Sequence, residues 1–246
     1  MSNAKMHPAI WIKASAMAAV VLLVALTMGV RPAMADDTQE AHQLVEKARL
    51  TFESFTADPY LGDNLRVLVN KAKAMLIYPQ VLRAAFIFGA SGGSGVLLAR
   101  DPASGSWHGP AFYTIGEASF GLQAGADASE VVLVALTERG LSALLSTSTK
   151  LGANASIALG PVGAGLTGAT ANISADIVSY SRNKGLYAGL SVEGAIVATR
   201  GALNAAYYGT EATPTDILIT HTVTSHDAAK LIADVTKVTG GSVATR

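Results

Sequence analysis

The chain has 246 residues, of which 50% are hydrophobic and 15% charged, with 18 basic and 18 acidic side chains and no cysteine. The lack of cysteine excludes disulfides, thiolate zinc sites, a cysteine nucleophile and the lipid-modified cysteine of a bacterial lipoprotein. The balanced charge argues against a general nucleic-acid binder, because such proteins carry a strong basic excess.

The first 35 residues have the pattern of an export signal. Lys5 and Lys13 supply positive charge, residues 14–30 form a charge-free apolar run of 17 residues, and residues 33–35 (AMA) form a small-x-small cleavage site. A retained membrane anchor is the alternative, but the run is shorter than the roughly 20 residues of a spanning helix. We expect cleavage near Ala35. This leaves 15 basic and 18 acidic residues, a net charge of −3, in a periplasmic or secreted chain.

Two helices are predicted next. Residues 38–56 carry apolar side chains at helical spacing. A second helix is expected to begin with Asp63 as its N-cap, to include Leu76 on its apolar face, and to end where Tyr78 precedes Pro79.

A β region follows, because 20 of the 24 glycines lie between Gly89 and Gly209 among short apolar runs. A helix is expected after Thr137, and helical patterns return in the last 46 residues. Helices, then strands, then helices favour an α+β fold: a strongly coiled antiparallel sheet or half-barrel with N-terminal and C-terminal helices packed on it. The predicted strands are 84–88, 95–100, 112–124, 131–136, 152–159, 166–180 and 186–199, and the late helices are 201–209, a short one beginning near Pro214, and 225–238.

Two glycine-rich stretches resemble nucleotide-binding loops. The first, FGASGGSG at 88–95, lacks the Gly-Lys-Ser/Thr ending of a Walker loop, and Val96 continues into an apparent strand. The second, at 163–168, has the form G-x-G-x-x-G but also leads into a strand, whereas a dinucleotide loop must open a helix. We therefore interpret both as turns or bulges of a sheet.

Catalytic patterns are weak. The spacing of His221 and His226 fits neither a helical metal-binding pair nor H-E-x-x-H, and no G-x-S-x-G motif occurs. Asp127 and Glu130 could face each other across a turn, but sequence alone cannot set a catalytic distance between carboxylates. The sequence gives no positive indication of an enzyme, a cofactor or a metal site.

A series of motifs resembles the SYLF domain family, which eukaryotic proteins combine with SH3 or FYVE modules. Six blocks occur in the family order over about residues 60–210, so the match does not depend on any one glycine motif. The blocks are VLRAAFIFGASGGSGVLLAR (81–100), GSWHGPAFYTIG (105–116), FGLQAGADASEVVLVALTERGLSALL (120–145), KLGANASIALGPVGAG (150–165), YSRNKGLYAGLSVEGAIV (180–197) and NAAYYG (204–209).

The resemblance implies binding to phosphoinositides or other anionic membranes, and some eukaryotic members act with actin. It also implies that FGASGGSG is the family's glycine-rich turn between two strands. In eukaryotic relatives a lysine-bearing amphipathic helix contacts the membrane, whereas helix 38–56 has mixed charge. For this chain the resemblance therefore implies the SYLF core and a general affinity for lipid or acyl chains.

The energetics favour an apolar contribution to lipid binding. A basic residue near an anionic membrane contributes about 1 kcal/mol to binding, so four of them together give at best roughly millimolar affinity. The four considered are Arg66, Lys71, Lys73 and Arg83. An acyl-chain groove could form over small strand residues such as Ala126, Ala155 and Ala195, although these could equally let the sheet coil tightly. The aromatic residues proposed for its rim, which could instead be core residues, are Trp107, Phe112, Tyr113 and Phe120.

The sequence thus predicts a signal peptide (1–35) and a single SYLF-type domain (36–246) with a C-terminal helical extension (211–246). Its predicted function is non-catalytic binding of anionic phospholipid or an acyl chain at a bacterial cell-envelope membrane surface, without nucleic acid or cofactor. The alternatives are an envelope adaptor that binds another protein and, with least support, an envelope hydrolase. The predicted lipid-contact residues are Arg66, Lys71, Lys73, Arg83, Lys150, Arg182, Lys184 and Trp107.

Overall fold

The computed structural model describes residues 33–85, 88–120, 125–161, 174–183 and 192–240. Contacts divide the chain into two compact units, Met1–Asp36 and Asp37–Arg246. The second unit contains the sheet and nearly all the described helical residues.

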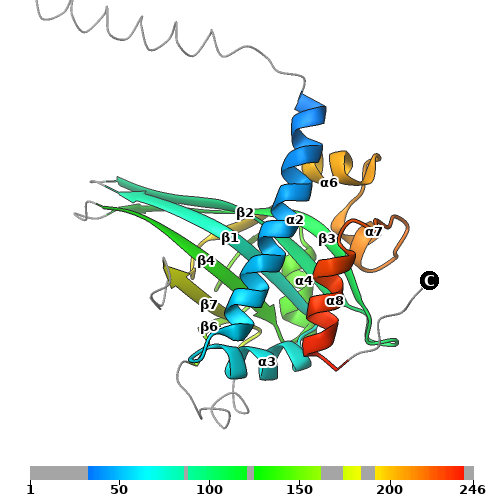
Figure 1. Cartoon of the computed structure of the whole chain (residues 1–246). Helices are drawn as coiled ribbons and strands as arrows, with labels where there is room; N and C mark the ends of the chain where they lie inside the picture. The colour runs from blue at the N-terminus through cyan, green and yellow to red at the C-terminus, as the bar shows by residue number, and fades with distance from the viewer. Residues whose placement is uncertain (1–32, 86–87, 121–124, 162–173, 184–191, 241–246) are drawn as a thin grey trace, which may run out of the picture. The chain divides into compact units, whose positions relative to one another are not determined.

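Eight strands form one sheet in the order β5-β8-β3-β2-β1-β4-β7-β6, in which every neighbouring pair is antiparallel except β6 and β7 (Figure 1). The sheet curls into a half-barrel with helices from both ends of the domain against it, which confirms the predicted α+β class. The strands are β1 (Ala74–Ala85), β2 (Phe88–Arg100), β3 (Trp107–Phe120), β4 (Gly125–Ala135), β5 (Ser148–Lys150), β6 (Ile157–Leu159), β7 (Ile177–Asn183) and β8 (Ile196–Thr199).

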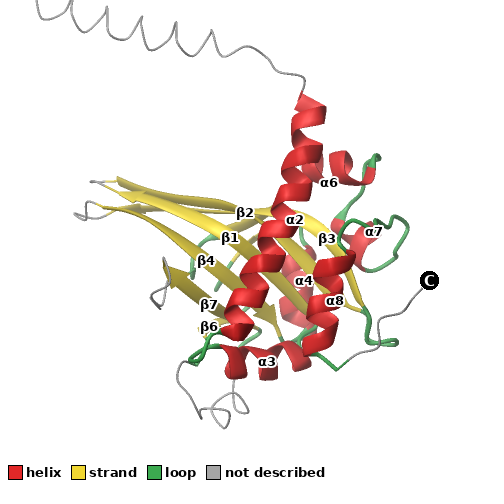
Figure 2. Cartoon of the chain, in the orientation of Figure 1, coloured by secondary structure: helices red, strands yellow, loops and turns green. Residues whose placement is uncertain are grey.

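Helices cover both faces of the sheet, which is why its central strands are continuous apolar runs (Figure 2). On one face α2, α3 and α8 pack against Met75, Ile77, Val96 and their neighbours. On the other face α4 and α7 pack against Leu76, Leu97 and theirs. The described helices are α2 (Ala33–Ala57), α3 (Gly62–Lys71), α4 (Glu138–Leu145), α6 (Gly201–Tyr208), α7 (Pro214–Leu218) and α8 (Ala229–Val238).

The prediction of the second helix was wrong at both ends. Helix α3 begins at Gly62, so that Asp63 lies in its first turn, and it ends at Lys71. Leu76 belongs to β1, where it pairs with strands on both sides. The spacing of apolar residues around Leu76 also fits a strand buried on both faces, and sheet pairing decides between the two.

The stretch FGASGGSG lies within β2, not in a turn between strands as the resemblance implied. It faces a register shift in β1 between Ile77 and Gln80, where Pro79 has no N–H to donate to a neighbouring strand. A Cβ at Gly93 would lie 2.2 Å from the carbonyl oxygen of Gln80, and one at Gly95 would lie 2.5 Å from that of Ile77. These glycines therefore let β2 approach an irregular strand.

The late helices largely follow the prediction. Thr137 caps α4 by accepting a hydrogen bond from the Gly140 N–H, and Pro214 opens α7 behind a capping box formed by Thr213 and Asp216. Helix α8 begins at Ala229, four residues after the predicted cap Ser225. Among the described helices, none combines the length and apolar character needed to cross a bilayer.

Candidate functional site

The predicted cations lie on separate parts of the domain. Lys71, Lys73 and Arg100 line one cleft of about 300 Å³ at the start of β1. Arg83 lies nine residues after Ala74, the first residue of β1, which is at most about 30 Å along the strand at ~3.3 Å per residue. The cleft and Arg83 thus belong to opposite ends of the sheet.

The other predicted cations do not join either group. Arg66 on α3 pairs with Asp63 at 2.9 Å and donates a hydrogen bond to the backbone carbonyl of Thr56. Lys150 is exposed at the end of the edge strand β5. Lys184 lies outside the described residues. Within the described chain, the basic residues therefore do not gather into one membrane-facing surface.

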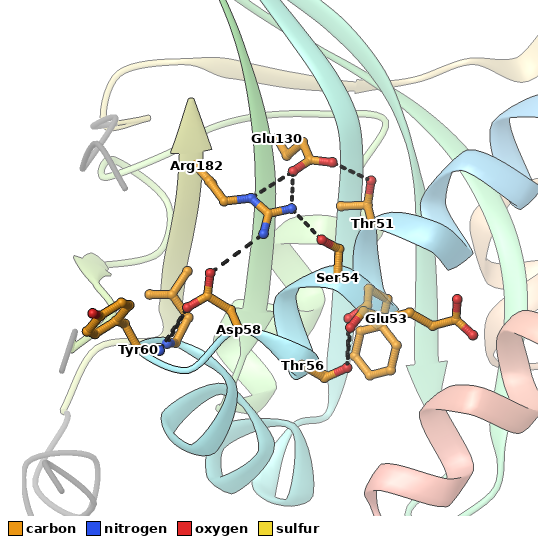
Figure 3. Close-up of polar contacts among 10 residues, drawn as sticks. Thr51, Glu53, Ser54, Thr56, Asp58, Tyr60, Glu130 and Arg182 are labelled. Carbon is orange, nitrogen blue, oxygen red and sulfur yellow. Dashed lines mark hydrogen bonds and ion pairs between the residues drawn. The ribbon is translucent and has the colours of Figure 1, made fainter. Parts of the chain in front are cut away.

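Arg182 on β7 is held inside a polar network that ties α2 to the sheet (Figure 3). Its Nε donates to Glu130 on β4 at 3.0 Å, and a terminal nitrogen donates to Ser54 on α2 at 2.7 Å. A third nitrogen lies 3.6 Å from the carboxylate of Asp58, and the guanidinium stacks 4.8 Å above the Phe55 ring. Because only 12% of its side chain is exposed, we assign Arg182 to the fold and leave it out of the lipid contact proposed below.

Trp107 is likewise a core residue. It is 3% exposed, and its Nε1 donates to the Thr239 hydroxyl at 3.4 Å. Phe112 and Tyr113 are fully buried. All three aromatic residues therefore belong to the hydrophobic core and do not line the rim of a groove. The side chain of Phe120 lies outside what the structure describes.

An open groove of about 620 Å³ lies at one end of the sheet. At this end the strands β1, β2 and β4 extend past the helices (Figure 1). Leu82 lies opposite Gly92 and Ala128, and Ala84 lies opposite Ala90 and Ala126, so all six share one face of the sheet. We call this surface the distal groove; its margins also include Arg83, Ser91 and Asp127.

The distal groove lies on the same face of the sheet as α2. Glu130, two residues beyond Ala128 on β4, accepts a hydrogen bond from Thr51 of α2 at 3.2 Å. A second hollow of about 220 Å³ beside α2 shares Leu82 and Gly92 with the groove. The apolar face that carries the helices thus continues beyond them, where Leu82 is 55% exposed.

Sequence reasoning found only part of this groove. Ala126 lines it, whereas Ala155 and Ala195 are buried in the core of the opposite face. Leu82 was missed because the strand that carries it was predicted to begin only at residue 84. Ala84 lay in that predicted strand but was not among the small residues proposed to form a groove. Residues 80–85 (QVLRAA) do not alternate strictly between polar and apolar, so the usable signal was the run of small residues at 89–95 (GASGGSG) on the neighbouring strand.

The described histidines do not form a catalytic centre. His221 pairs with His108 of β3, not with His226: the two rings stack 3.7 Å apart, and the backbone carbonyl of Leu218 lies 3.1 Å from His221 Nε2. Burial, together with the neighbouring imidazole, lowers the pKa of His108. No group of three or more His, Asp or Glu side chains suitable for a metal occurs in the described part of the chain.

Two carboxylates of the strand region are engaged in structural contacts. Glu130 belongs to the Arg182 network. Asp176 accepts hydrogen bonds from the Thr137 hydroxyl at 2.6 Å and from the N–H and hydroxyl of Ser156, which lower its pKa to about 2. The contacts of Asp176 join three segments: the start of α4, the residue before β6 and the residue before β7.

Comparison with known proteins identifies the family. Residues 116–238 match the Ysc84 family model, described as "Las17-binding protein actin regulator", over half of the chain and through α7 and α8. The chain belongs to the Ysc84 family. The SYLF resemblance is thereby confirmed, and the name of this family describes binding and regulation.

Curated eukaryotic relatives support the assignment. The chain is 33% identical over 153 residues to human SH3 domain-containing YSC84-like protein 1, covering 61% of this chain and 44% of that one. It is 33% identical over 156 residues to protein YSC84 of Saccharomyces cerevisiae, covering 61% and 33%. It is 30% identical over 186 residues to LAS seventeen-binding protein 3 of S. cerevisiae strain YJM789, covering 74% and 39%. The chain therefore matches less than half the length of each of these relatives.

Proposed function

We propose that this protein is a non-catalytic phospholipid binder that contacts a membrane surface through the distal groove. The observation that carries the proposal is the exposed apolar face at the end of the sheet. Leu82 stands 55% exposed among alanines and a glycine, whereas Met75, Ile77 and Val96 on the same face are buried under helices. Soluble proteins rarely expose a contiguous apolar patch without a partner for it.

Charge is a weaker basis for the contact. Arg66, Lys73 and Arg182 already have carboxylate partners. Lys71, the last residue of α3, lies near the start of β1, whereas Arg83 lies near the end of that strand, so a local contact adds about 1 kcal/mol for each cation that it reaches. We expect electrostatic attraction to assist the contact, with Arg83 beside the groove.

Apolar burial supplies more energy. At ~0.8 kcal/mol per methylene, covering six to eight methylenes of an acyl chain contributes roughly 5–6 kcal/mol, which corresponds to a dissociation constant of about 0.1 mM. This fits reversible association with a lipid surface. With the predicted cleavage near Ala35, we further propose that the protein acts at a bacterial cell envelope, where it helps to maintain the membrane.

A second candidate function is protein binding by strand addition. Strand β5 (Ser148–Lys150) lies at one edge of the sheet and, among the described residues, pairs only with β8. Such an edge can accept an extended segment of another protein. A stoichiometric partner captured from envelope extracts by the wild type, and lost when the exposed Lys150 of β5 is replaced by proline, would favour this candidate.

The lipid proposal is tested by flotation of the protein with phosphatidylglycerol vesicles. We expect Leu82→Asp to reduce binding at least about tenfold, since placing a charge in an apolar lipid environment costs ~2–3 kcal/mol. Leu50→Asp is the matched control, because Leu50 is 51% exposed on the outer side of α2. Equal loss in both variants, or loss of wild-type binding in high salt, would show that the distal groove is not the contact.

A further inference from the structure

The cleft at the start of β1 has the features of an anion site. Lys73 and Arg100 are neighbours, because the Arg100 N–H donates to the Lys73 carbonyl at 2.8 Å. Lys71 at the end of α3 lines the same cleft, and Pro102 and Leu141 give it apolar walls. This basic cleft, defined by Lys71, Lys73 and Arg100, lies at the opposite end of β1 from the distal groove.

Arg100 is held in place without a counter-charge. Its Nε donates to the carbonyl of Gly105 at 3.0 Å, and a terminal nitrogen donates to the carbonyl of Asn70 at 2.9 Å. Across the described residues, no carboxylate lies within ion-pair distance of Arg100 or Lys71. Two carbonyls therefore orient a guanidinium that keeps its full positive charge.

The nearest acid, Asp101, is directed into its own loop. Its carboxylate accepts hydrogen bonds from the N–H groups of Ala103 at 3.0 Å and Ser104 at 2.6 Å, and from the Ser104 hydroxyl at 2.9 Å. Hydrogen bonds from Ser104 lower the pKa of Asp101. Asp101 stabilises the loop that bears the Gly105 carbonyl, and all three of these bonds go to its Oδ1 atom.

The cleft already holds one carboxylate. Glu138 in the first turn of α4 places an oxygen 2.6 Å from Lys73 Nζ, yet its side chain is 70% exposed and can turn into solvent. With Glu138 in place the three cations and two acids of the cleft carry a net charge of +1, and they carry +2 when Glu138 turns away. The cleft therefore suits a ligand with one or two carboxylates that exchanges with Glu138.

We propose that the basic cleft binds an acidic peptide segment of a protein partner, in which carboxylates displace Glu138 from Lys73 and adjoining apolar side chains pack on Pro102 and Leu141. Arginine and lysine side chains recognise carboxylates through charge-assisted hydrogen bonds. The choice of a peptide over a lipid headgroup rests on the proposed function, because a membrane at the distal groove would lie at the other end of β1, up to about 30 Å along the strand from the cleft.

The test needs no membrane, so its failure is distinct from failure of the lipid proposal. The full chain is titrated by NMR with an acetylated, amidated hexapeptide of alternating Glu and Leu, and amide shifts at 71–73 and 100–105 are followed. We expect saturable shifts, a dissociation constant raised at least about fivefold in Lys71→Ala and Lys73→Ala, and no change in Lys237→Ala on α8.

Glu138→Gln provides a gain-of-function arm. Because it removes the internal competitor, we expect it to tighten peptide binding about threefold or more. The proposal is overturned if the peptide gives no saturable shift up to ~10 mM, if a Gln-Leu peptide binds equally well, or if Glu138→Gln has no effect. It is also overturned if phosphatidic acid vesicles perturb these amides and the peptide does not.

Discussion

Replacing Arg182 by alanine removes the central cation of the network that joins α2 to the sheet. The variant leaves the Glu130 and Asp58 carboxylates, 31% and 17% exposed, without their shared partner. Removing one member of a buried ion pair costs ~3–5 kcal/mol, and partial exposure places this case at the lower end. The lost stacking on Phe55 adds about 0.5–1 kcal/mol. We expect the free energy of unfolding to fall by about 3.5–4 kcal/mol.

Urea unfolding followed by circular dichroism measures this change. At ~2–4 °C per kcal/mol for a domain of this size, the melting temperature should fall by about 7–16 °C. Lys73→Ala is the control, because it breaks a pair with the exposed Glu138 and should cost less than ~1 kcal/mol. Adding Glu130→Gln to Arg182→Ala should recover part of the loss. An effect of Arg182→Ala no larger than that of the control would refute the reasoning.

Three further outcomes are expected. Gly93→Ala should destabilise the domain by ~1–3 kcal/mol in urea unfolding, whereas Gly92→Ala should not, because a Cβ at Gly92 finds its nearest neighbour at 3.7 Å. The Thr137 hydroxyl and other donors lower the folded-state pKa of Asp176 to about 2. The ionised Asp176 therefore contributes its full share of folding stability above the unfolded pKa of ~3.9, and this share is lost as the pH falls towards 2. We expect Asp176→Asn to weaken the dependence of the melting temperature on pH between these two values. The pKa of His108 is also lowered in the folded state, so below pH ~6.5 the unfolded chain binds more protons than the folded chain. We therefore expect folding stability to decline as the pH falls through that value. The variant His108→Gln should show a smaller decline of the melting temperature.

Local chemistry made much of the fold predictable. Helix α4 follows from Thr137 as its cap, and α7 follows from Pro214 at its first position. The apolar spacing over 38–56 identifies the core of α2, since Ala41, Ala48 and Phe52 are buried as the pattern requires. Such signals lie within one or two turns of the chain, so no tertiary information is needed to read them.

Features that depend on distant segments could not be read in this way. Leu76 fits a helix as well as a strand until β2 and β4 lie beside it. The stack of His108 and His221 joins residues that are far apart in the sequence. The distal groove depends on where α2 stops covering the sheet, and the basic cleft needs Arg100, which becomes significant only beside Lys73.

The most direct measurement of the central claim is the environment of the distal groove when lipid is present. Because the chain has no cysteine, Ala84→Cys carries a single environment-sensitive nitrobenzoxadiazole label in the groove, and Ala153→Cys carries the same label on an exposed turn as the control. With phosphatidylglycerol vesicles we predict a blue shift and an intensity increase at position 84, persisting in high salt, and no change at position 153. Unchanged emission at position 84 while the protein floats with the vesicles would contradict the proposed contact.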